Sequence, residues 1–185
     1  MSKSINLGIL LVTLLIGVAI GYWLTPEYQI QNTQMKKTHD LGVADQWVDL
    51  RYIDNMIAHH LSAIYLLEQA QQQSDRQEIK ALAEAVIASD KIGIETLYAQ
   101  KLDWYDNDRQ VTEFNKTNLG TRDEKFDLRL INALLIHHQE AIDAAKDISS
   151  KSVRNEVLNT ASEVTVSLTD NAEQLIQWRK EWYGI

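Results

Sequence analysis

Two stretches of the sequence decide the fold: WVDLRYIDNMIAHHLSAI at residues 47–64 and KFDLRLINALLIHHQEAI at residues 125–142. They open two longer segments, residues 47–106 and 125–184, which match without gaps at a constant offset of about 78. A match of this length predicts an internal duplication. The most distinctive aligned pairs are His59-His60 with His137-His138 and Trp104-Tyr105 with Trp182-Tyr183.

Each copy is predicted to form a helix hairpin. In the first copy, apolar residues recur at helical spacing from Ile53 to Leu67 and again from Ile79 to Leu97. Abundant Ala, Leu, Glu, Gln and Lys, with a single proline, favour helices over strands. We expect helices near residues 45–73, 75–105, 122–149 and 152–183.

Polar residues at capping-box spacing mark the expected helix starts. They are Ser74 with Gln77 or Asp75 with Glu78, Ser152 at the position equivalent to Ser74, and Thr121 with Glu124. Amphipathic hairpins of this length cannot bury their apolar faces alone. The sequence therefore predicts an all-α fold in which two hairpins close into an antiparallel four-helix bundle over residues 45–184. Within it, repeat 1 is 45–106, the linker is 107–121 and repeat 2 is 122–184.

The N-terminus has the pattern of a membrane helix. Lys3 precedes an uncharged run from Leu7 to Leu24, which Tyr22-Trp23 closes at an interfacial position. We expect residues 1–26 to be a transmembrane anchor and the polar residues 27–44 to be a stalk. A cleaved signal peptide is the alternative, because Ala19-Ile20-Gly21 resembles a small-x-small site. Either reading places the bundle on the periplasmic or other extracytoplasmic side.

Composition excludes several function classes. A formal net charge of -8 without a Lys/Arg cluster argues against nucleic acid as a partner. The absence of cysteine leaves His, Met, carboxylate or carbonyl groups as the only metal ligands. The sequence has no phosphate loop, nucleophile elbow or acid–base carboxylate pair, so an enzyme is not predicted.

The paired histidines are the candidate metal ligands. Neighbouring residues on a helix point about 100° apart, so the two members of a pair face different directions. His60 and His138 lie on the apolar stripes and are expected to face inward, whereas His59 and His137 lie on the flank, near a helix seam or solvent. Met56 lies one turn before His60. Imidazole with thioether suits copper, and imidazole alone also suits zinc or nickel.

The alternative is that these imidazoles only pack or hydrogen-bond across the bundle. No Glu precedes either pair by three residues, which argues against a di-iron oxidase. Asp49 and Asp127 are expected to cap a helix or pair with a basic residue.

The segment MIAHHLSAI (Met56 to Ile64), followed by EIKALAEAVIASD and LDWYD, resembles the bacterial family called domain of unknown function (DUF) family 305. The family signature is Met-Ile-Pro-His-His, then an Ala-Ile pair and a second helix ending in a Trp-rich segment. LLIHHQEAI to WRKEWYG resembles it equally, so the resemblance spans residues 45–184. It implies a ferritin-like, exported helical bundle, and some members bind copper in the periplasm and contribute to metal resistance.

Several family positions differ here. The signature proline is Ala58 in the first copy and Ile136 in the second, and the methionine survives only as Met56. The family's Gln, Glu and Met of the second helix are Asp90, Gly93 and Leu97, and then Leu168, Asn171 and Leu175. A methionine-rich copper site therefore does not carry over.

Two functional hypotheses follow. The first is a membrane-anchored extracytoplasmic protein that binds a transition metal, copper favoured, through His59, His60, His137 and His138 with Met56. It predicts that the two pairs converge. The second is a metal-free structural or interaction module, such as an accessory subunit of a membrane complex, with pairs that are separated or bonded elsewhere. The membrane is the expected partner, and a homo-oligomer or a membrane-complex partner is left open.

Overall fold

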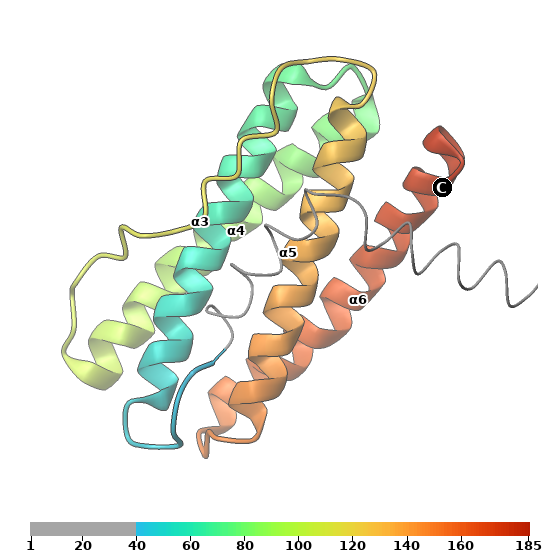
Figure 1. Ribbon diagram of the computed structural model, residues 1–185. Coiled ribbons are helices and arrows are strands. Elements are labelled where there is room, and N and C mark those ends of the chain that lie inside the picture. Colours follow the sequence, from blue (N-terminus) through green and yellow to red (C-terminus); the bar gives the residue numbers. More distant parts are fainter. Residues whose placement is uncertain (1–39) are drawn as a thin grey trace, which may run out of the picture. The chain divides into compact units, whose positions relative to one another are not determined.

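The computed structural model describes residues 40–185 of the chain. This part contains four helices and no strand. They are α3 (Val48–Gln73), α4 (Gln77–Tyr105), α5 (Phe126–Ser149) and α6 (Asn155–Tyr183) (Figure 1). The predicted all-helical class is confirmed. The predicted anchor at 1–26 and the stalk as far as residue 39 lie outside the described residues. Between residues 40 and 185, no helix is both long and apolar enough to cross a membrane.

The helices end where the sequence predicts but begin two to four residues later. The predicted capping boxes are wrong, since none of the four N-cap residues makes a side-chain cap. Instead, a short polar side chain two residues earlier accepts a hydrogen bond from the N-cap N–H, in the turn that Asp and Ser favour. The acceptors are Asp45, Ser74, Asp123 and Ser152, at 2.9 to 3.1 Å.

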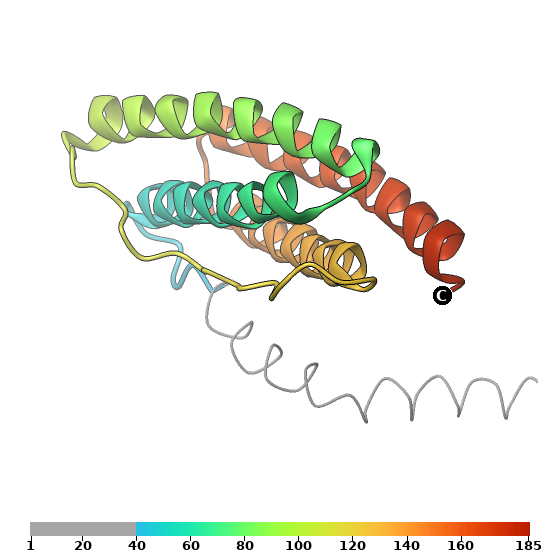
Figure 2. The same cartoon turned by 90° about the horizontal axis from the view of Figure 1, so that it is seen from above.

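The helices pack as two hairpins that meet through α3 and α5. In Figure 1 the teal α3 and the orange α5 lie side by side, and Figure 2 shows α4 and α6 on the same side of this pair. Each end of the α3–α5 interface has its own apolar cluster. One contains Ile57 and Ile148, and the other contains Leu67 and Leu130. Burying one such side chain stabilises the fold by about 1.5–3 kcal/mol.

The structure extends the duplication toward the N-terminus. Arg51 Nε donates to the Leu41 carbonyl at 2.6 Å, and Arg129 Nε donates to the Leu119 carbonyl at 2.6 Å. Gly42 (φ 73°) begins this turn in the first copy, and its equivalent Gly120 has φ 78°. Positive φ favours glycine at both places. The helical unit therefore starts near residue 40, within the segment predicted to be a stalk.

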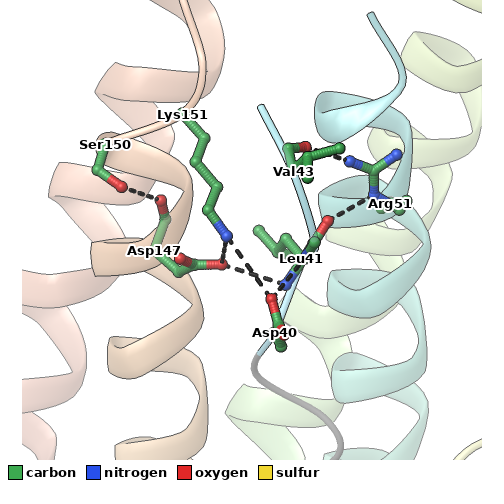
Figure 3. A network of polar contacts seen from close by, with 8 residues as sticks. Asp40, Leu41, Val43, Arg51, Asp147, Ser150 and Lys151 are labelled. Atoms are coloured by element: carbon green, nitrogen blue, oxygen red, sulfur yellow. Dashed lines mark hydrogen bonds and ion pairs between the residues drawn. The ribbon is translucent and has the colours of Figure 1, made fainter. Parts of the chain in front are cut away.

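Each of these N-terminal turns is bound to the other copy. The Leu41 N–H donates to Asp147 Oδ2 at 3.1 Å, and the Leu119 N–H donates to Gln69 Oε1 at 2.9 Å. Figure 3 shows the first of these contacts, in which Lys151 also pairs with Asp147. Since Gln69 and Asp147 are equivalent positions, the two copies are related by an approximate twofold exchange.

The arrangement of the helices explains the path of the linker between α4 and α5. Because α3 and α5 are antiparallel, the chain must return along the first hairpin before the second copy begins, as the yellow trace in Figure 1 shows. Hydrogen bonds hold it there: the Val111 N–H donates to the Tyr98 hydroxyl, and the Asn115 N–H donates to Ser62 Oγ.

An arginine from each hairpin turn reaches across to the other copy. Each arginine pairs with the aspartate in the first turn of the opposite hairpin and covers its closing tryptophan. Arg76 Nε lies 3.4 Å from Asp127 Oδ2 and its Cζ 4.0 Å from the Trp182 ring centroid, while Arg154 Nε lies 3.5 Å from Asp49 Oδ2 and its Cζ 4.1 Å from the Trp104 centroid. Both aspartates thus pair with a basic residue, as expected. We call these contacts the crossed arginine clamps.

Candidate metal centre

A cavity of about 530 Å³ lies between the two apolar clusters and is lined by all four helices. Helices α3 and α5 bring all five predicted ligands to it. These ligands are Met56, His59, His60, His137 and His138. Leu82 and Val86 of α4, with Val164 and Leu168 of α6, contribute apolar walls. The cavity therefore combines convergent imidazoles with a largely apolar lining, which is typical of ligand sites.

His59 and His137 meet where α3 contacts α5. Their rings stack in parallel, with centroids 3.6 Å apart and an interplanar angle of 3°. The His137 side chain is buried, at 7% exposure. The flank position expected from helical spacing is thus the seam between the two hairpins, and the two pairs converge there.

His60 and His138 extend from the same seam and are half-buried. His60 Nδ1 lies 2.9 Å from Asp90 Oδ1, and His138 Nδ1 donates to the Leu134 carbonyl at 2.5 Å. An acceptor at Nδ1 holds the ring proton on that atom, which leaves Nε2 with a free lone pair. Both imidazoles are therefore held in the tautomer that can ligate a metal through Nε2.

The electrostatics favour neutral imidazoles. Burial lowers the pKa of His137 to about 3, and the neighbouring His138 and His60 add to the effect. Burial also lowers the pKa of His138, against the opposing effects of its bond to Leu134 and of the Asp90 charge. Metal ions bind the neutral ring, so the cavity does not need to release protons from these two groups near neutral pH.

Two polar atoms in the cavity wall have no hydrogen-bond partner among the described residues. They are His137 Nε2 and Asp90 Oδ2, on side chains that are 7% and 9% exposed. Buried polar atoms are nearly always bonded, and leaving one unpaired costs about 1–3 kcal/mol. Either atom could take a bound cation as its missing partner.

Gly93 makes room for His60. A Cβ at this position would lie 3.2 Å from His60 Nε2, closer than an ordinary contact. The sequence interpretation counted Asp90 and Gly93 only as departures from the family pattern. The structure shows that both act on His60, one as its hydrogen-bond partner and one by leaving space.

The candidate ligands are not arranged around one common position. Within residues 40–185, no three His, Asp or Glu side chains are grouped closely enough to hold an ion. The two sequence hypotheses are therefore each met in part. The pairs converge through His59 and His137, as metal binding requires, while His60 is bonded to Asp90, as the packing alternative expects.

The fold and cavity define a class: a duplicated, all-helical protein with histidines of both hairpins in one cavity. Residues 49–126 match the family model described as Domain of unknown function (DUF305). The resemblance read from the sequence is confirmed over this stretch, which comprises the first copy and its linker.

Solved structures of a protein named CopM share the fold. The Cu(I)-bound form is 27% identical with a TM-score of 0.67, covering 75% of this chain and 99% of that chain. The Ag-bound form obtained by soaking is 25% identical with a TM-score of 0.64 and the same coverage. The apo form is 27% identical with a TM-score of 0.63, covering 71% of this chain and 96% of that chain. A search of curated proteins gave no match.

Proposed function

We propose that this protein is a membrane-anchored, extracytoplasmic metal-binding protein that holds a transition metal, copper by preference, in the cavity between its hairpins. The ligands are drawn from His59, His60, His137 and His138, with Met56 as a thioether ligand. The observation that carries the proposal is that all four imidazoles, two from each copy, line one cavity. In this proposal the four helices form an antiparallel, ferritin-like bundle around the site.

The donor set suits copper. His60 and His138 offer Nε2 lone pairs, and the buried Met56 sulfur lies one helical turn from His60. Because no three His, Asp or Glu side chains of residues 40–185 are grouped in advance, binding requires the side chains in the cavity to rotate toward the ion. The likeness to CopM, solved with Cu(I) and with Ag, supports metal binding at the level of the family.

The cellular location rests on the sequence. The uncharged run from Leu7 to Leu24 and the interfacial Tyr22-Trp23 support an anchor at residues 1–26, with the helical domain outside the cytoplasm. We assign no enzymatic activity, since the sequence has no nucleophile elbow and no acid–base carboxylate pair.

The test is a titration of the full-length chain in detergent with Cu(I) and Ag(I), under a competing chelator. The variant replaces His59, His60, His137 and His138 with Ala. The matched control is His39→Ala, which changes the fifth histidine of the sequence. We expect stoichiometric binding in the parent and the control and its loss in the variant. Equal, weak binding by all three folded proteins would overturn the proposal.

A second candidate function is a metal-free interaction module, either as a homo-oligomer or in a membrane complex. It is favoured by the bond between His60 and Asp90, which occupies one nitrogen without a metal. This candidate predicts that the fourfold variant loses stability or partner binding while metal binding in the parent stays substoichiometric.

A further inference from the structure

The two halves of the cavity differ in buried charge, because the carboxylate that the second copy contributes to the lining, Glu163, is exposed. Asp90 lies on α4 of the first copy, and its equivalent on α6 is Leu168, so only one half brings a buried carboxylate. Asp90 is 9% exposed. In the described residues, its only ion-pair partner is His60, and no Lys or Arg pairs with it.

Asp90 acts on imidazoles of both copies. Its Oδ1 lies 2.9 Å from His60 Nδ1 of the first copy. Its charge raises the pKa of His138 of the second copy, against the larger effect of burial. Its Oδ2 is buried and has no hydrogen-bond partner among residues 40–185. A buried carboxylate without a full cationic partner is costly. A cation between the two imidazoles would relieve that cost.

We propose that Asp90 sets the charge selectivity of the cavity by favouring divalent over monovalent ions. The inference rests on the proposed metal-binding function and concerns which ion the same site prefers. Coulomb attraction to a fixed charge is twice as large for a divalent ion as for a monovalent ion at the same place. A carboxylate is also a harder ligand than imidazole or thioether, which favours Cu(II) over Cu(I) or Ag(I). The Met56 thioether favours the monovalent ions instead.

The decisive variant is Asp90→Asn. An amide oxygen can still accept the His60 Nδ1–H, so this change removes the charge and leaves the hydrogen bond in place. Asp103→Asn makes the same chemical change at an exposed position of α4 and is the matched control. Leu168→Asp is the opposite change, because it places a carboxylate at the position of the second copy that is equivalent to Asp90.

The measurement is the dissociation constant for Cu(II) and for Ag(I), by chelator competition, on the full-length chain. We take the Asp90 charge to lower the dissociation constant of a monovalent ion about 10-fold. Asp90→Asn then weakens Ag(I) binding about 10-fold and Cu(II) binding about 100-fold. The preference for Cu(II) then falls about 10-fold, while Asp103→Asn leaves it unchanged. Leu168→Asp raises the same preference.

Equal losses for both ions, or no loss, would overturn the inference and leave the metal site itself intact. If the parent binds neither ion, the proposed function fails instead. Circular dichroism checks that each variant is folded. If Asp90→Asn does not fold, the result for Leu168→Asp decides, since an unchanged or lower Cu(II) preference there contradicts a charge effect.

Discussion

The ends of the helical domain and its middle have diverged to different extents. At the ends, the crossed arginine clamps and the N-terminal turns repeat contact for contact in both copies. In the cavity, the equivalent of Asp90 in the second copy is Leu168, and the equivalent of Gly93 is Asn171. Each clamp needs a residue from both copies, so the ends can change only together. Asp90 and Gly93 instead contact His60 of their own copy, so these two positions can change in one copy alone.

The largest effect is expected at the clamps. Arg154→Ala leaves the buried Asp49 without its cation and uncovers Trp104, and we expect the free energy of unfolding to fall by about 2–3 kcal/mol. Arg76→Ala should cost the same, because its partners are equivalent. Urea unfolding measures both. The exposed Lys180→Ala is the control, and a loss below about 1 kcal/mol in either arginine variant would show that the ends do not hold the hairpins together.

The next effect is a pH dependence that arises in the middle. The folded protein keeps His137 neutral down to about pH 3, whereas the unfolded chain takes up this proton near pH 6.5. The unfolded state therefore binds more protons in that window, and stability falls as the pH falls. From about pH 6.5 to 5 this single group removes about 2 kcal/mol. His137→Gln should flatten the profile of the metal-free protein by that amount, and an unchanged slope would contradict the buried, neutral imidazole.

Gly93→Ala should separate stability from binding. Alanine stabilises a helix interior by up to about 1 kcal/mol, but its Cβ would displace the His60 ring by a few tenths of an ångström. We expect thermal stability to hold or rise slightly while Ag(I) affinity falls several-fold. Asn171→Ala, the same position in the second copy, should leave affinity unchanged. Equal affinities in both variants would argue that the glycine is unrelated to the site.

The smallest effect concerns a further difference between the copies. Glu140 occupies the position of Ser62, and burial raises the pKa of its carboxyl to about 7. Above that pH the folded state bears the cost of a half-buried charge that the unfolded state does not. Glu140→Gln should stabilise the protein by less than about 1 kcal/mol at pH 8 and have no effect near pH 4. The exposed Glu84→Gln serves as the control, and a gain of the same size at both pH values would exclude charge burial as the cause.

The fold could be predicted largely from the sequence because the duplication doubles every helical signal. The helix ends at Gln73, Tyr105 and Ser149 follow from the apolar periodicity. The helix starts could not be placed as well, because Asp45 and Ser74 can serve either as caps or in a turn before the cap.

The candidate site was predictable in part. The His-His spacing separates the directions of the two imidazoles, but it leaves His59 and His137 near either a helix seam or solvent. The contact between α3 and α5 decides for the seam. The role of Asp90 could not be anticipated, since it depends on the distance between α3 and α4. No periodicity in one helix reports that distance.

The measurement that tests the central claim most directly is an anomalous diffraction map of crystals of this protein grown with Ag(I). We predict one strong peak per chain inside the cavity, within bonding distance of Nε2 of His60 and His138. A peak only at the surface, or none in the cavity of a well-ordered crystal, would contradict the account.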